Sequence, residues 1–202
     1  MDKVRDVSRR AALSAPAAML LAAGASACKA EDQQATGAKS NTLVAYFTRS
    51  GNTRVIAEQL QRDLSADLFQ IVPEEAYPAD YEQNVEQARL ERDRGFEPPL
   101  KGRVTNIAAY GTVFLGFPIW GETAPPPIRS FLRTHDLAGK TVRPFITHGG
   151  YGLGDSLSVL KAHAPSARIL APFVMEADQE RRTMTQVRQW LAVSLPASRK
   201  TG

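Results

Sequence analysis

The chain has 202 residues, of which 43% are hydrophobic, and this is enough for one well-buried domain. Its 25 basic and 21 acidic residues give a net charge of +4, and no basic run is long enough to indicate nucleic-acid binding. The single cysteine excludes an internal disulfide and every metal site built from several cysteines.

Residues 1–27 have the composition of an export signal. A short charged stretch precedes an Ala- and Leu-rich run over 11–27, which contains Pro16 and Gly24. Because this run is only weakly hydrophobic, we favour a cleaved signal over a permanent membrane span. Within the predicted signal, "SRRAAL" at 8–13 resembles the twin-arginine motif, which directs the export of folded proteins. A plain basic region is the alternative.

Cys28 follows "ASA" at 25–27, the position of the lipidated cysteine in a bacterial lipobox. Position 25 is Ala where lipoboxes usually carry Leu, so an ordinary signal-peptidase site with an unmodified Cys28 is the alternative. We expect an exported protein that is either periplasmic or attached to the outer side of a membrane. Attachment to the membrane would occur only through a lipid on Cys28. Residues 28–41 are predicted to be a flexible tether, 42–196 the folded domain and 197–202 a disordered tail.

From residue 42 onward, short apolar runs alternate with segments of helical periodicity. Expected strands cover 43–47, 67–73, 108–119, 140–150 and 167–175, and Pro73 suits a place for the second strand near the sheet edge. Expected helices cover 53–64, 80–94, a proline-led segment within 124–137, 154–164 and 178–195. The order predicts an α/β fold, a doubly wound five-stranded parallel sheet in the order 2-1-3-4-5 with helices on both faces.

Ligands of such sheets bind beyond the carboxyl ends of the strands, where the strand order reverses. In this order the reversal lies between the first and third strands, so the loops at 48–53, 118–126 and 148–155 are expected to meet there. Residues 74–103 are the least readable part of the chain, with one charged helix and no sign of a donor pocket.

The loop at 48–53 has the chemistry of a phosphate site. It supplies several hydroxyl groups, a flexible Gly51 and the start of a helix, whose free amides and dipole favour an anion. It matches neither the Walker loop nor the dinucleotide fingerprint, because the required glycine and lysine spacings are absent. A helix cap formed by Ser50 or Asn52 is the alternative.

Three motifs resemble one family. "TRSGNT" at 48–53 closely resembles the flavodoxin phosphate loop, which holds the monophosphate of FMN. "FPIWGETAPPPIRSFL" at 117–132 and "THGGYGLGDSLSVL" at 147–160 resemble the second and third flavin loops of that family. The resemblance covers roughly residues 42–195 and implies a flavodoxin-like fold with FMN as cofactor.

The resemblance also implies roles for individual residues. Trp120 would stack on the isoalloxazine ring, although a core position is the alternative, and Tyr151 would be either stacked or exposed. The phosphate would be held through the hydroxyls and amides of Thr48, Ser50, Gly51, Asn52 and Thr53. The loop around Trp120 would be shaped by Pro118, Ile119 and Gly121, and the other side of the ring would be bordered by Gly149, Gly150, Tyr151 and Gly152.

Two arginines depart from the family's pattern, because the usual carriers are strongly acidic and hold the phosphate without nearby positive charge. Arg49 either pairs with the phosphate or a substrate anion or points into solvent, and Arg54 has no assigned role. His148 is either a hydrogen-bonded residue at a strand end or a proton donor, and Asp155 is expected to cap the fourth helix.

FMN carries the redox chemistry, and the protein tunes it through stacking, hydrogen bonds and charge. We therefore expect an exported FMN-binding redox protein of flavodoxin type, which transfers electrons to a redox partner protein or a small quinone-like acceptor. The alternatives are an FMN-dependent quinone-type reductase and a flavin-free binding module with the same fold. Without residues 1–27 the net charge falls to +2, and the lack of an acidic surface argues against electrostatic steering toward a basic partner.

Overall fold

The structure is a computed structural model that describes residues 40–176 and 180–194. The predicted export signal, Cys28, most of the tether and the C-terminal tail lie outside the described residues. Within the described part, no helix combines the length and the apolarity needed to cross a membrane.

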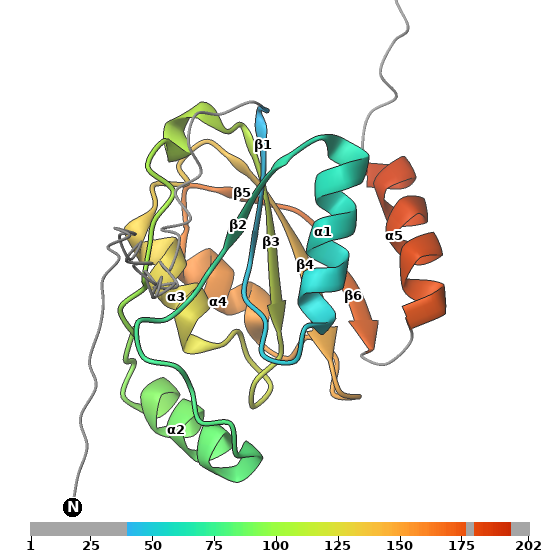
Figure 1. Ribbon diagram of the computed structural model, residues 1–202. Coiled ribbons are helices and arrows are strands. Elements are labelled where there is room, and N and C mark those ends of the chain that lie inside the picture. The colour runs from blue at the N-terminus through green and yellow to red at the C-terminus, as the bar shows by residue number, and fades with distance from the viewer. Residues whose placement is uncertain (1–39, 177–179, 195–202) are drawn as a thin grey trace, which may run out of the picture. The chain divides into compact units, whose positions relative to one another are not determined.

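A parallel sheet forms the centre of the fold (Figure 1). Its strands run in the order β2-β1-β3-β4-β5, which confirms the predicted fold class and strand order. The second strand lies at the edge, as Pro73 suggested. The first four strands are β1 (Thr42–Tyr46), β2 (Asp67–Gln70), β3 (Thr112–Pro118) and β4 (Thr141–His148).

The predicted fifth strand over 167–175 is divided into two short strands. β5 (Arg168–Ile169) pairs with the start of β4, and β6 (Phe173–Glu176) pairs with its end. The break falls between Leu170 and Pro172, and Pro172 has no amide hydrogen to donate to β4. The proline therefore accounts for an interruption that the apolar run had concealed.

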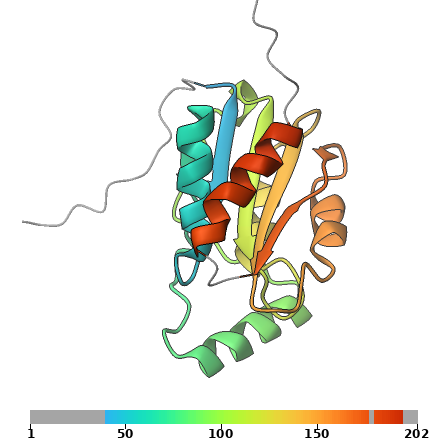
Figure 2. The same cartoon turned by 90° about the vertical axis from the view of Figure 1, so that its right-hand side faces the viewer.

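Helices cover both faces of the sheet, as predicted. α1 (Asn52–Leu64) and α5 (Glu180–Ser194) lie on one face, and α3 (Pro126–Thr134) and α4 (Ser156–His163) lie on the other (Figure 2). Alternate residues of β1 point to opposite sides, so Val44 packs in the core under α1 and α5 while Leu43 packs in the core under α3 and α4. A short 3₁₀ helix (Ile107–Ala109) precedes β3.

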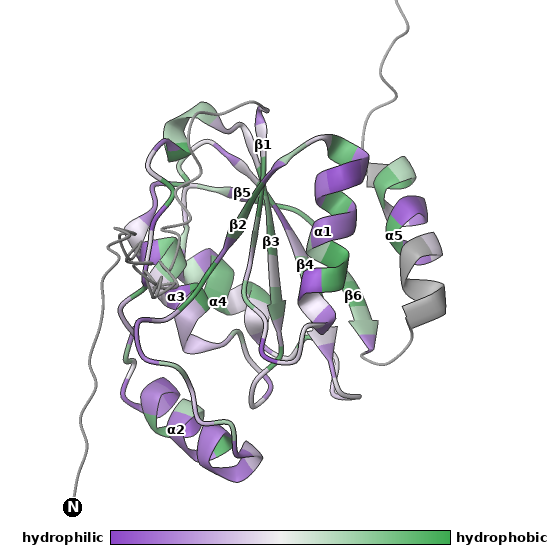
Figure 3. Cartoon of the chain, in the orientation of Figure 1, coloured by the Kyte–Doolittle hydropathy of each residue, from purple (hydrophilic) through white to green (hydrophobic). Residues whose placement is uncertain are grey.

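α2 (Tyr81–Asp93) differs from the other helices. It lies beyond the carboxyl ends of the strands and is mostly hydrophilic, whereas the strands are hydrophobic (Figure 3). Asp80 caps it by accepting a hydrogen bond from the Gln83 amide at 2.9 Å, which stops the helix from extending toward its N-terminus. Its buried residues are Asn84 and Ala88, so little apolar area holds it in place.

Candidate functional site

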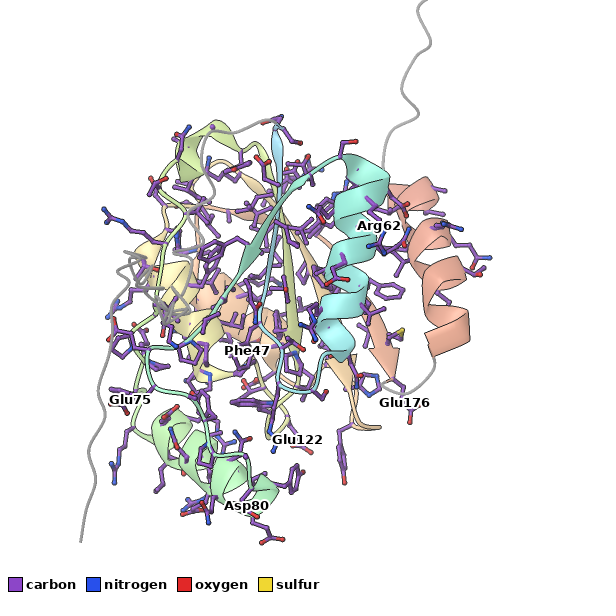
Figure 4. The ribbon with its side chains drawn as sticks, viewed as in Figure 1. Phe47, Arg62, Glu75, Asp80, Glu122 and Glu176 are labelled. Atoms are coloured by element: carbon purple, nitrogen blue, oxygen red, sulfur yellow. The ribbon has the colours of Figure 1, made fainter. Side chains whose placement is uncertain are left out.

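The three predicted loops meet at the carboxyl edge of the sheet, where Glu122 and Glu176 are labelled in Figure 4. The hydroxyl oxygens of Thr53 and Thr147 lie 2.9 Å apart, which joins the first loop to the end of β4. The Ile119 amide donates to the Thr147 carbonyl at 2.8 Å, and the Asp155 amide donates to the Glu122 carbonyl at 3.0 Å. These bonds connect the second loop to β4 and to the third loop.

The first loop leaves the start of α1 open. Gly51 occupies the N-cap position with φ 99° and ψ −15°, and no side chain caps the helix there. The Val55 amide donates to the Gly51 carbonyl at 3.2 Å, so the three preceding amides of 52–54 have no carbonyl within the helix to bond. The alternative in which Ser50 or Asn52 caps α1 is therefore wrong.

The loop's own side chains divide into two groups. The Thr48 hydroxyl accepts a hydrogen bond from the Gly51 amide at 3.0 Å, which fixes the turn, and the hydroxyl of buried Thr53 is paired with Thr147. Ser50 is exposed and Asn52 is half-buried, so both remain accessible from outside. Together with the open helix start they form a group of donors suited to an anion.

The two arginines of the first loop point in different directions. The Arg49 guanidinium donates to the Ala79 carbonyl at 2.9 Å and lies 5.7 Å from the centroid of the Tyr81 ring. Arg54 stays beside the loop, because its Nη2 atom lies 3.5 Å from the position that a Cβ on Gly51 would take. Burial raises the pKa of Tyr46, and the Arg54 charge partly offsets this rise. Arg49 is thus exposed, but its guanidinium has partners at the start of the segment that leads into α2.

The second loop makes a tight turn. Trp120 and Thr123 exchange backbone hydrogen bonds of 3.1 and 3.4 Å, and the two residues between them, Gly121 and Glu122, have φ values of 56° and 64°. A positive φ is uncommon for a residue other than glycine, so Glu122 adds strain to this turn. The positive φ of Gly121 favours glycine, and the end of the Arg92 side chain lies close to the position that a Cβ would take.

Trp120 is half-buried at the border between the loop and the core. Its ring contacts Phe47 at 5.1 Å between centroids and 80° between planes, and Tyr77 at 4.9 Å and 81°. Trp120 therefore combines features of the two predictions made for it, ring stacking and a core position. It is on a loop beside the candidate site, and it also packs on the core. We call Phe47, Tyr77 and Trp120 the aromatic cluster.

The third loop is shaped by glycines. Gly150, Gly152 and Gly154 have φ values of 108°, 71° and 52°. His148 accepts a hydrogen bond at Nδ1 from the Gly150 amide at 3.0 Å, as expected for a histidine at a strand end. Tyr151 is 78% exposed. Asp155 takes the N-cap position of α4, but its side chain makes no capping hydrogen bond.

Sequence analysis did not predict that residues 77–93 approach this edge. Tyr77 belongs to the aromatic cluster, and its hydroxyl donates to the Glu91 carboxylate. Burial raises the pKa of Tyr77 well above its usual range, and the hydrogen bond to Glu91 raises it further. Arg92 donates to the Gly121 carbonyl at 3.4 Å. A possible signal was the aromatic pair around Pro78, in a stretch otherwise rich in charge.

Two cavities lie away from the three loops. A cavity of about 1120 Å³ is lined by one side of α2, by residues 95–97 and by Arg133. A second, of about 770 Å³, lies between the C-terminal ends of α3 and α4. The first is lined mostly by residues of the segment 74–103, in which the sequence shows no sign of a donor pocket. Among the described residues, no group of three His, Cys, Asp or Glu side chains could hold a metal ion.

Comparisons with known proteins agree with this geometry. The flavodoxin family model matches residues 41–193. The chain is 34% identical to a candidate flavoprotein of Bacteroides eggerthii DSM 20697, with a TM-score of 0.66 over 78% of this chain and 98% of that one. A candidate flavoprotein of Bacteroides uniformis ATCC 8492 is 28% identical, with a TM-score of 0.66 over 75% of this chain and 97% of that one.

A more distant similarity extends to a flavoprotein of Lactobacillus acidophilus NCFM whose crystal structure contains FMN. It is 21% identical, with a TM-score of 0.58 over 71% of this chain and 97% of that one, which shows a shared fold. Among curated proteins, none matches the chain.

Proposed function

The chain belongs to the flavodoxin family, and from this membership we propose that it binds FMN at the edge formed by its three loops and serves as an exported redox protein. The observation that carries the proposal is the uncapped start of α1 behind Gly51, which leaves three amides for a phosphate. Gly51 has no side chain that could bond these amides, so they stay available to a ligand.

The chain's residues fit the phosphate end of FMN. The amides of Asn52 and Thr53 and the accessible Ser50 side chain would hold the phosphate, and the helix dipole favours its negative charge. Arg54 stands beside the same loop and adds a positive charge to it. Thr48 and Thr53 shape the loop through their own hydrogen bonds.

At the end of the site that would hold the flavin ring, the second loop supplies the aromatic side chain of Trp120. The third loop supplies the exposed side chain of Tyr151. The bound flavin would supply the redox chemistry, since it accepts and releases electrons singly or in pairs. The protein's part is to orient the ring between these loops and to limit water around it.

Electron transfer to a partner protein or to a small quinone-like acceptor is the function that we favour. A quinone-type reductase is the alternative, although the cavity of about 1120 Å³ beside α2 lies away from the three loops. Reduction in controlled one-electron steps distinguishes the two. A stable one-electron reduced flavin would favour the carrier, and direct two-electron reduction would favour the reductase.

Export and lipid attachment complete the proposal, on the basis of the twin-arginine-like stretch and Cys28. Folded export agrees with a cofactor that binds noncovalently before transport. Replacement of Arg9 and Arg10 by Lys should abolish export, and mass spectrometry of the mature N-terminus should detect lipid on Cys28. Export of the double variant at the normal level would exclude the twin-arginine route.

The deciding experiment is an FMN titration of the purified protein, followed by visible absorption and flavin fluorescence. We expect a yellow protein or saturable uptake of FMN. A colourless protein that takes up no FMN would support the flavin-free binding module instead.

A further inference from the structure

Residues 77–93 are tied by side chains to two loops of the proposed FMN site. Arg49 of the first loop bonds to the Ala79 carbonyl, and Arg92 of α2 bonds to the Gly121 carbonyl of the second loop. Tyr77 contacts Trp120 of the second loop. Since α2 buries little apolar surface, these polar and aromatic contacts locate the segment at the carboxyl edge.

Glu91 fixes the orientation of Tyr77. Its Oε2 atom accepts the Tyr77 hydroxyl at 2.5 Å, and its Oε1 atom accepts the Gln87 side-chain amide at 2.8 Å. Both carboxylate oxygens are thus engaged, which limits rotation of the Glu91 side chain. The raised pKa of Tyr77 keeps its phenol protonated and able to donate throughout the physiological pH range.

Tyr77 in turn limits the orientation of Trp120. The two rings are nearly perpendicular with centroids 4.9 Å apart, and Phe47 makes a similar contact with Trp120 at 5.1 Å. Perpendicular aromatic pairs have preferred geometries, so two of them restrict the plane of the indole more than one does. Phe47 directly follows β1, whereas Tyr77 depends on Glu91 for its position.

We propose that Tyr77 and Glu91 are positioning residues of the FMN site: Glu91 fixes Tyr77, and Tyr77 fixes the plane of Trp120 beside the flavin ring. The proposal rests on the proposed function, because it assigns the pair a role in flavin binding through Trp120. It adds a fourth chain segment, around α2, to the three loops of the site.

The test uses the two tryptophans of the chain. Replacement of Trp190 by Phe leaves Trp120 as the single source of tryptophan emission. In this background, Tyr77→Phe and Glu91→Leu should each shift Trp120 emission in the flavin-free protein. Each should also weaken FMN binding about two- to tenfold, the range that corresponds to the loss of one hydrogen bond. Glu91→Gln keeps an acceptor for the phenol and should give an intermediate result.

Tyr110→Phe is the matched control. The Tyr110 hydroxyl donates to Asp67 Oδ2 at 2.9 Å, so Tyr110 is a second tyrosine paired with a carboxylate, but it lies at the opposite end of the strands. This variant should lose similar stability and leave both Trp120 emission and FMN affinity unchanged.

Two results would overturn the proposal. One is wild-type Trp120 emission and FMN affinity in both Tyr77→Phe and Glu91→Leu; the other is an equal effect of Tyr110→Phe. The proposed function fails separately, if the unaltered protein takes up no FMN. Trp120 emission would then still show whether the pair positions the indole.

Discussion

The side-chain oxygens of Thr53 and Thr147 lie 2.9 Å apart in the interior, where the two residues are 1% and 2% exposed. This contact joins the first turn of α1 to the end of β4, and the Thr147 carbonyl also accepts the Ile119 amide of the second loop. One residue of β4 thus fixes two loops of the candidate site.

Thr53→Val should therefore reduce both stability and FMN affinity. It leaves the Thr147 hydroxyl buried without its partner, which costs about 1–3 kcal/mol. Urea unfolding measures the free energy, and flavin fluorescence measures the affinity. In the double variant with Thr147→Val no hydroxyl is left unpaired, so its loss should be smaller than the sum of the single losses. Additive losses would show that the two hydroxyls are not coupled.

Gly51→Ala should weaken FMN binding through the backbone. Gly51 has φ 99°, and an alanine there carries a strain of about 1–2 kcal/mol although the added Cβ has space. Gly139→Ala is the control, since Gly139 has φ 72° and nothing within 4 Å of its added Cβ. Both variants should lose stability, and only Gly51→Ala should lose FMN affinity. Equal FMN affinities of the two variants would show that the phosphate does not bind at this loop.

Arg54→Gln should reduce FMN affinity more than Arg49→Gln does. Arg54 lies beside Gly51, whereas the Arg49 guanidinium is bonded to Ala79 and lies over Tyr81. The Arg54 contribution should also fall as salt is added, because an exposed charge is screened. Affinity titrations at low and high ionic strength measure this. A larger loss in Arg49→Gln would mean that Arg49 leaves Ala79 to bind the phosphate.

Gly116→Ala should disrupt the centre of the sheet. A Cβ on Gly116 would come within 2.1 Å of the Phe145 ring, and the two residues are register partners on β3 and β4. Such overpacking typically costs about 1–3 kcal/mol. The double variant with Phe145→Leu makes room and should recover part of the loss. Wild-type stability of Gly116→Ala would show that the ring moves aside freely.

Stability should fall as the pH decreases through the range in which His135 titrates. Burial lowers the pKa of His135 below its usual value of 6.5, and its Nε2 accepts the Val104 amide at 2.9 Å. Between the folded and the unfolded pKa, the unfolded chain binds a proton at this histidine and the folded chain does not. The stabilisation is therefore complete above pH 6.5 and is lost as the pH falls toward the lower folded pKa.

His135→Gln removes this titration and should flatten the pH dependence by up to about 1.4 kcal/mol per pH unit. Urea unfolding between about pH 7.5 and 5.5, an interval that spans the usual histidine pKa, measures the slope. An unchanged slope in His135→Gln would assign the effect to other groups.

The sequence alone determined the order of elements, the parallel sheet and its strand order, because burial on both faces gives strands a continuous apolar pattern. It also located the three loops, since parallel strands place their carboxyl ends at one edge. The division of the fifth strand was not predicted, because the apolar run continues on both sides of Pro172.

Only the tertiary structure decided the partners of Arg49, the place of Trp120 in the aromatic cluster and the approach of α2 to the second loop. Arg49 bonds to Ala79, 30 positions away, and Arg92 bonds to Gly121, 29 positions away. Such contacts depend on how separate segments pack in space, and a helix as hydrophilic as α2 carries no periodic apolar face that would predict its neighbour.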